Sequence, residues 1–148
     1  LSEYSLKKIS RATGIKQNKG SFDKLHPSVL PQREIFEKGV RTLAKAADRI
    51  LRKHGKAIIG KQFATKRLAD IMTDLFVLAA VLSRVSTSVQ ENGEANAAKE
   101  LEILQAFASQ VLRRTKDNFA QIDENDDELI KSLANHALEN EKYIWDNV

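Results

Sequence analysis

Residues 55–62 (Gly-Lys-Ala-Ile-Ile-Gly-Lys-Gln) have glycine and lysine at the spacing of a phosphate-binding P-loop. In that motif the last position carries a serine or threonine whose hydroxyl binds Mg²⁺, and the loop follows a buried strand. Gln62 has no hydroxyl, and the residues before Gly55 have the periodicity of a helix. We therefore predict that this segment does not hydrolyse nucleotides.

Asp70 and Asp74 are four residues apart, so on a helix both carboxylates lie on one face. Metal sites in helical bundles use Glu-x-x-His sequences on facing helices, and this chain contains none. Lys66 and Arg67 precede Asp70 by four and three residues, which is close enough for an ion pair. We predict a structural ion-pair cluster and no metal site.

The three histidines, His26, His54 and His136, are far apart in sequence, and the chain has no cysteine. His136 falls between the apolar positions Leu133 and Ala137, which predicts a half-exposed side chain. Phosphotransfer histidines also lie on the faces of four-helix bundles, so this role for His136 stays open as an alternative. Ser83, Ser86, Thr87 and Ser88 lie on a predicted helix, with no histidine nearby to activate them. We assign no catalytic, cofactor-binding or metal-binding residue to this chain.

These side chains are predicted to lie on helices, because apolar residues recur at steps of three and four. A first helix is expected to begin at Ser28, a good N-cap, with Pro31 in its first turn, and to end at Gly55. Its apolar positions are Phe36, Val40, Leu43, Ala47 and Ile50.

Three more helices are expected after it. The second covers about residues 57–91 and ends at the Asn92-Gly93 turn, and the third continues through Phe119. The acidic stretch 123–127 ends the third helix and begins the fourth, for which Asn125 is a candidate cap. Between Leu75 and Leu82 the second helix is apolar on all sides, which predicts that neighbours enclose it on most sides.

The predicted fold class is all-α, because no stretch shows the alternation of a strand. Short connections make consecutive helices antiparallel. We predict an up-and-down four-helix bundle over residues 29–148, preceded by a basic N-terminal linker at residues 1–28.

The charge of the chain is distributed unevenly. Residues 1–67 contain 17 Lys/Arg and 5 Asp/Glu, whereas residues 68–148 contain 7 and 15, for a total of +4. A nucleic-acid-binding protein is not expected to have this asymmetry. No apolar run of 18 residues indicates a membrane-spanning helix, and no secretory signal is visible. The chain begins at Leu1, which predicts that it is a piece of a longer protein.

Six cations in the linker are the candidate contact residues for a membrane or a partner. The simpler interpretation is a solvated connector; the functional one is a segment that lies on anionic lipid, where each cation contributes about 1 kcal/mol. These cations are Lys7, Lys8, Arg11, Lys16, Lys19 and Lys24.

Several short sequences together resemble the C-terminal helical domain of the very-long-chain acyl-CoA dehydrogenase family, including the paralogue used in respiratory complex I assembly. The similarity is clearest over about residues 25–90 and covers the last two helices only in outline. The sequences are His26-Pro27, Lys53-His54-Gly55-Lys56, Gln62-Phe63, Arg67-Leu68-Ala69-Asp70 and Val81-Leu82-Ser83-Arg84.

The resemblance implies that this segment is a degenerate second copy of the flavoenzyme's catalytic bundle. Where the family has a flavin-contacting arginine and a phenylalanine, this chain has Leu51 and His54. Gly93 is the last glycine, so the family's later glycine-rich flavin loop has no counterpart. We therefore expect no cofactor in this segment, FAD in the parent chain, and the catalytic glutamate outside this sequence.

We interpret the chain as the non-catalytic C-terminal domain of an FAD-dependent acyl-CoA dehydrogenase of fatty acid β-oxidation. Its expected roles are domain packing, oligomer control and docking. Expected partners are the catalytic domain of its parent chain, an anionic membrane surface and a second copy of itself, with no nucleic acid. The expected location is cytoplasmic or the mitochondrial matrix, peripheral on the inner membrane face. The alternative is a free-standing helical interaction module whose basic flank binds lipid or an acidic protein.

Overall fold

The computed structural model describes residues 24–142 and residue 145. Its α-helices are α2 (Leu30–His54), α3 (Gln62–Asn92), α4 (Ala98–Ala120) and α5 (Asp127–Asn140). Two 3₁₀-helices, η2 (Pro27–Val29) and η3 (Gly55–Gly60), precede α2 and α3. No strand occurs in this described part of the chain, which confirms the all-α prediction. Linker residues 1–23, with five of the six candidate cations, lie outside the described residues.

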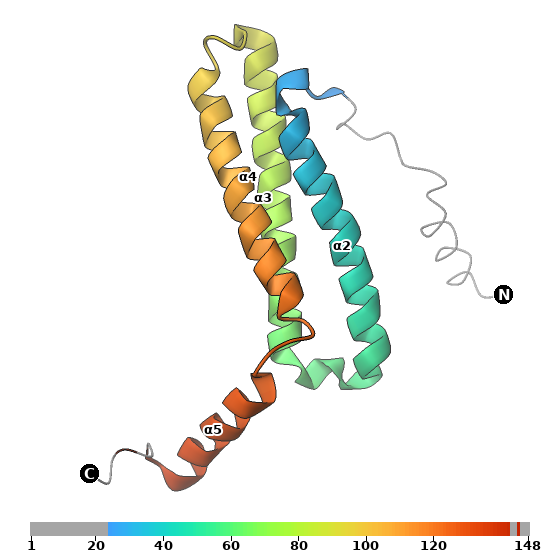
Figure 1. Ribbon diagram of the computed structural model, residues 1–148, viewed down its shortest axis with the longest axis vertical. Coiled ribbons are helices and arrows are strands. Elements are labelled where there is room, and N and C mark those ends of the chain that lie inside the picture. The colour runs from blue at the N-terminus through green and yellow to red at the C-terminus, as the bar shows by residue number, and fades with distance from the viewer. Residues whose placement is uncertain (1–23, 143–144, 146–148) are drawn as a thin grey trace, which may run out of the picture.

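The helices α2, α3 and α4 lie side by side and run alternately down, up and down, as Figure 1 shows. The closest packing joins α3 to α4 and α3 to α2, with a smaller contact between α2 and α4. The helical-bundle prediction and the up-and-down order of these three helices are therefore confirmed. The fourth helix, α5, leaves the end of this three-helix core and points away from it.

The core lies mainly between α3 and α4, and one face of α2 closes it. Leu78, Leu82 and Leu104 have no exposed surface, and Ile71 and Val111 are equally buried. A second, smaller cluster lies at the end of the core where α4 stops. Since burial of one such side chain contributes about 1.5–3 kcal/mol, α3 is the main stabilising element, as its sequence predicts. The residues of the second cluster are Ala46, Ile50, Ala64 and Ile122.

The beginning of the bundle differs from the prediction at Ser28. This residue does not cap α2; it lies in η2, and α2 follows Val29 without a side-chain cap. The imidazole of His26 instead accepts a hydrogen bond from the Ser28 backbone N–H, at 3.3 Å. The His26 backbone N–H donates to the buried Ser86 hydroxyl at 2.8 Å and so connects the segment before α2 to α3.

The second predicted helix begins later than expected. Residues 55–60 form η3, and α3 starts only at Gln62. Gly55 ends α2 with a φ of 52°, and Gly93 ends α3 with a φ of 79°, so both predicted stops are confirmed. The segment with P-loop spacing is therefore a helical corner between α2 and α3.

One expectation about α3 is wrong. The run from Leu75 to Leu82 is not enclosed on most sides, because Phe76 within it is 75% exposed, and Met72, just before it, is 58% exposed. These two side chains, one helical turn apart, point away from the buried row of α3. Apolar residues of α3 therefore lie on two faces of the helix, and the described residues cover only one of these faces.

The helix α5 has 14 residues, and none of them is buried. It is shorter than the fourth helix expected from the sequence, whose apolar position Ile144 lies outside the described residues. Asn125 is not the cap that the sequence suggests, because the N-cap is Asp126; the Asn125 side-chain carbonyl does accept the Asp127 backbone N–H at 3.2 Å, just before the helix. The acidic residues Asp127 and Glu128 occupy its first turn, where their negative charge interacts favourably with the helix dipole.

Candidate interaction surfaces

The carboxylates of α3 form ion pairs, as the sequence predicts: Asp70 has its expected partner Lys66, and Asp74 has a partner on α4. Lys66 donates to Asp70 at 2.5 Å along the helix. Asp74 accepts two hydrogen bonds from Arg114 of α4, at 2.9 and 2.6 Å. These bonds raise the pKa of the Arg114 guanidinium. Over residues 24–142 and 145, no group of three or more His, Asp or Glu side chains has the arrangement of a metal site.

Arg67 was expected to pair with Asp70, and here the structure differs. Its guanidinium donates two hydrogen bonds to the Asp127 carboxylate of α5, both at 2.6 Å. The two side chains keep only 13% and 16% of their surface exposed. A bidentate pair that is largely shielded from water is stronger than a solvent-exposed pair along one helix, which explains the choice of partner.

Asp127 and its neighbour Glu128 are held as carboxylates. The hydrogen bond from Arg67 holds the pKa of the Asp127 carboxyl below its usual value and raises the pKa of Arg67. Lys61 donates to Glu128 at 2.6 Å, and this bond lowers the pKa of Glu128. These two ion pairs connect the first turn of α5 to the first turns of α3.

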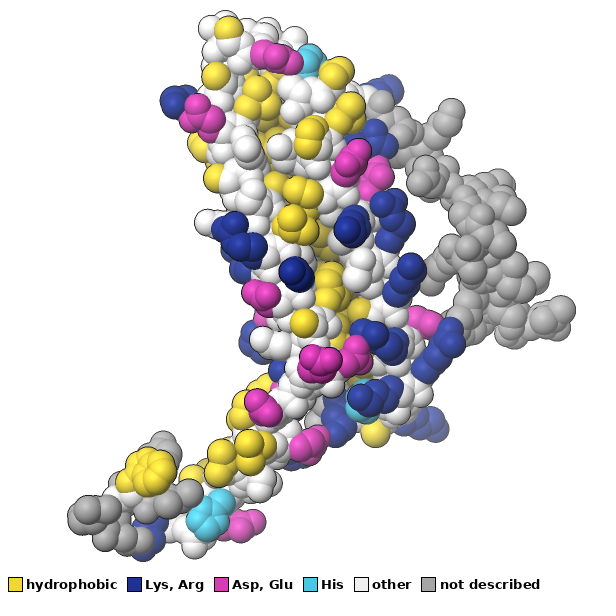
Figure 2. Space-filling model, in the orientation of Figure 1, with side chains coloured by type: hydrophobic (Ala, Val, Ile, Leu, Met, Phe, Trp, Pro, Cys, Tyr) yellow, Lys and Arg dark blue, Asp and Glu magenta, His cyan; other side chains and the backbone are white. Residues whose placement is uncertain are grey.

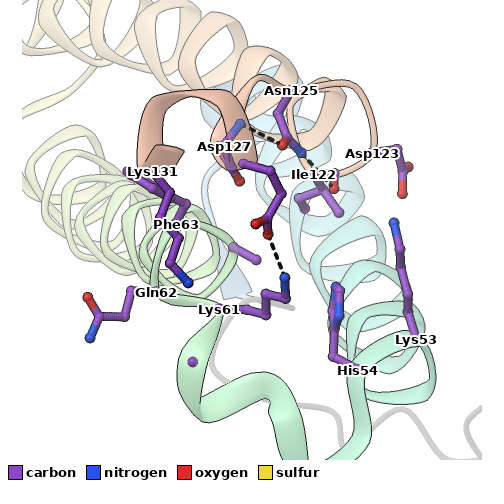
Figure 3. A pocket seen from close by; sticks show the side chains of 13 residues that line it. Lys53, His54, Lys61, Gln62, Phe63, Ile122, Asp123, Asn125, Asp127 and Lys131 are labelled. Atoms are coloured by element: carbon purple, nitrogen blue, oxygen red, sulfur yellow. Dashed lines mark hydrogen bonds and ion pairs between the residues drawn. The ribbon is translucent and has the colours of Figure 1, made fainter. Parts of the chain in front are cut away.

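A cavity of about 280 Å³ lies beside these ion pairs, between the α2–α3 corner and the connection from α4 to α5. Figure 3 shows Lys61 extending toward α5 on one side of the cavity, with His54 and Lys53 from the end of α2 on another. Phe63 and Ile122 supply its apolar wall. Charged groups of both signs line it, so its charge does not select one kind of ligand.

This corner does not fit the flavin nucleotide that the resemblance associates with it. Leu51 stands where the family has its flavin-contacting arginine; its side chain is exposed and has no hydrogen-bond donor. The nearby cations Lys61 and Arg67 are held by carboxylates of α5. The cavity is also at or below the lower limit for a site that encloses a small ligand. We therefore derive no flavin chemistry for this chain.

The histidines are not brought together. His26 lies at the start of η2, half-buried His54 at the end of α2, and His136 is exposed on α5. His136 Nδ1 lies 3.3 Å from the side-chain nitrogen of Asn140, one turn along the same helix. None of the residues of α5 is buried, so no core lies beside His136. Its phosphotransfer role remains an untested alternative.

Part of the uncovered surface is apolar. Four large apolar side chains of α5 lie on one half of the helix circumference, and each of them is 50–75% exposed. Figure 2 shows yellow side chains on α5 and a second yellow band between α2 and α4. Val40, Leu51 and Leu112 are exposed apolar residues of those two helices. The four side chains of α5 are Leu129, Ile130, Leu133 and Leu138.

Of the six candidate contact cations, the structure describes only Lys24. Its side chain is exposed, and its backbone carbonyl accepts a hydrogen bond from Gln90 of α3 at 3.0 Å. The cations of α2 were not among the predicted contact residues, although they recur at steps of three and four. They are Lys38, Arg41, Lys45, Arg49 and Arg52. Within the described ranges, no helix has the length and apolarity needed to cross a membrane.

Comparisons with known proteins agree with this architecture. Very long-chain specific acyl-CoA dehydrogenase of rat mitochondria is 27% identical over 146 residues, which are 95% of this chain and 22% of the relative. The mouse enzyme is 30% identical and the human enzyme 28% identical, each over 116 residues, 78% of this chain and 18% of the relative. The chain thus spans about a fifth of the length of the curated relatives that it matches.

A family model described as "ACAD9/ACADV, C-terminal domain" matches residues 27–143. The match begins at Pro27, the first residue of η2, and extends past the end of α5. Because it covers most of the sequence, this protein belongs to the family of ACAD9/ACADV C-terminal domains.

Proposed function

We propose that this chain is the C-terminal packing and docking domain of an FAD-dependent acyl-CoA dehydrogenase that acts on long or very long acyl chains in mitochondria. In the whole protein the flavin domain carries out α,β-dehydrogenation of the acyl-CoA, and the helical domain contributes surface. The mitochondrial names of the relatives, and their roughly fivefold greater length, support this assignment.

The observation that carries the packing role is the uncovered apolar face of α5. A helix with an apolar half needs a partner surface, because its exposed leucines otherwise order water at a free-energy cost. In an isolated four-helix bundle this face would lie on the band between α2 and α4. Here α5 and that band are both left open, which supports a role in which the rest of the parent chain covers them.

The docking role belongs to the basic segment before α2. Its cations, Lys7 to Lys24, outnumber its acids six to two, so it is attracted to a surface of negative charge. Membrane contact and partner contact both use this attraction. Control of oligomeric state follows from the same packing, since a covered apolar face no longer associates with a second copy.

Hydrogen exchange tests the packing role directly. Backbone amides of α5 should exchange fast in the 148-residue chain and be protected at least tenfold in the full-length protein encoded by the gene. Amides of α3 near Leu78 and Leu82, buried in either form, are the internal control. Equal exchange of α5 in both forms would refute the packing role, and a gene that encodes no flavin domain would refute the assignment itself.

A further inference from the structure

The outward face of α2 carries a continuous row of cations. Lys38, Arg41, Lys45, Arg49 and Arg52 recur at steps of three and four, so they lie in one line on the helix. At 1.5 Å per residue this line is about 21 Å long. We call these five residues the α2 basic ridge. Figure 2 shows dark blue side chains gathered along this side of the molecule.

The ridge lies opposite the buried face of α2. Successive residues turn by 100°, so the mean direction of the ridge is roughly 120° from that of the buried residues Ala46 and Ile50. All five side chains are exposed, with 54–65% exposure for the three arginines. The exposed apolar residues Val40 and Leu51 of α2 lie on other faces of the helix.

Carboxylates offset only part of this charge. Arg49 pairs with Asp123 at 2.8 Å, and Arg52 pairs with Asp48 at 2.6 Å. The Arg41–Glu37 distance is 3.6 Å, so that pair is looser. Among the residues that the structure describes, Lys38 and Lys45 have no ion pair. The first residue and the middle residue of the ridge therefore keep an uncompensated positive charge.

We propose that the α2 basic ridge docks on the anionic headgroups of a phospholipid bilayer. This inference rests on the proposed docking role of residues 1–28 and adds a folded surface directly after them. A straight helix face touches a plane along its whole length, and mobile lipid phosphates adjust to any spacing of the cations. A protein partner would instead require apolar or aromatic anchors at the centre of the contact, and the ridge positions carry none.

The test measures binding of the whole 148-residue chain to vesicles of equimolar phosphatidylcholine and phosphatidylserine. The ridge variant replaces Lys38, Arg41 and Lys45 with glutamine. Because each cation near an anionic surface changes the partition coefficient roughly fivefold, the expected loss is on the order of 100-fold. Added salt should weaken binding of the unmodified chain.

A matched variant of α4 controls for net charge. It replaces Lys99, Arg113 and Lys116 with glutamine, again two lysines and one arginine, one of which pairs with a nearby glutamate. Its binding should change less than about fivefold, since these cations lie away from the ridge. A charge-preserving variant with Lys38→Arg, Arg41→Lys and Lys45→Arg should bind normally. Circular dichroism verifies that every variant keeps its helices.

Three results would overturn the inference. One is an equal loss in the α4 and ridge variants, which would reduce the effect to net charge. Another is normal binding of the ridge variant while a variant with Lys7, Lys8 and Arg11 replaced by glutamine loses binding; the docking role of residues 1–28 would then survive alone. The third is binding of the unmodified chain to poly-glutamate but not to vesicles, which would identify an acidic polypeptide as the partner.

Discussion

Replacing Arg67 by methionine should release α5 from α3 and leave the three-helix core folded. Methionine keeps the length of the apolar stem but removes both hydrogen bonds to Asp127. The helix α5 has no buried residue, and an isolated helix of 14 residues is marginal in water. Its helical structure therefore depends on the Arg67–Asp127 pair and on the weaker pair of Lys61 with Glu128.

The expected magnitude follows from the geometry of the pair. Hydrogen bonds to charged groups contribute about 1.5–3 kcal/mol, whereas fully exposed ion pairs contribute about 0.2–1 kcal/mol. Arg67 and Asp127 are 13% and 16% exposed and bond at 2.6 Å, so we expect about 2 kcal/mol. Since 1.36 kcal/mol corresponds to a factor of ten, the opening of α5 should become up to about 30-fold more frequent.

Hydrogen exchange measured by mass spectrometry is the appropriate assay, because it separates α5 from the core. Lys66→Met is the matched control: it breaks the ion pair with Asp70 one residue away, and that pair is 70% and 43% exposed. We expect this control to change exchange less than about fivefold. The reasoning would be refuted if α5 exchanged equally fast in both variants, or if the amides around Leu78 accelerated together with α5 in the Arg67 variant.

Three further predictions concern stability. Thermal unfolding should show a loss of about 2–5 kcal/mol for Leu78→Ala, whose side chain is fully buried, and less than about 0.5 kcal/mol for Phe76→Ala, whose side chain is 75% exposed. Gly93→Ala should lower the free energy of unfolding by about 1–3 kcal/mol because the residue has φ 79° and ψ 158°. Gly60→Ala, with open space around a new Cβ, should be neutral or stabilising. Equal melting temperatures of the two variants would contradict this prediction. The lowered pKa of Asp127 means that its pair contributes fully at pH 7 and begins to weaken below the unfolded-state pKa of about 3.9. The contribution is lost as pH falls through the folded-state pKa of Asp127. Circular dichroism at acid pH should therefore show a loss of helix in the natural chain that is absent from the Arg67→Met variant.

Much of the fold follows from the spacing of apolar residues. The rows through Leu78, Leu82 and Leu104 predicted α3 and α4 because a helix returns to the same face every three or four residues. The two turn glycines marked helix ends correctly, since glycine adopts positive φ easily. Periodicity is less informative about the corner at residues 55–60, where the apolar Ile59 is 86% exposed in a 3₁₀-helix.

Interactions between distant residues could not be predicted in the same way. The sequence favoured Asp70 as the partner of Arg67, because only neighbours along a helix are visible before the chain is folded. Asp127, 60 residues away, competes successfully because its geometry is bidentate and shielded from water. The apolar pattern of α5 likewise indicates that a face needs covering, but not which surface covers it. Residues such as Phe76 therefore seemed to belong to a core that the described residues do not enclose.

The helix α3 is tied at two separate points to the segments that flank the three-helix core. The Ser86 hydroxyl accepts a hydrogen bond from the His26 backbone N–H near one end of α3, and Arg67 donates to the Asp127 carboxylate near the other end. The two ties are 19 residues apart in sequence, which corresponds to about 28 Å along the axis. The domain is consequently a strut of fixed length with a joint at each end. A body attached before Pro27 and another seated on α5 would be kept at opposite ends of this rod.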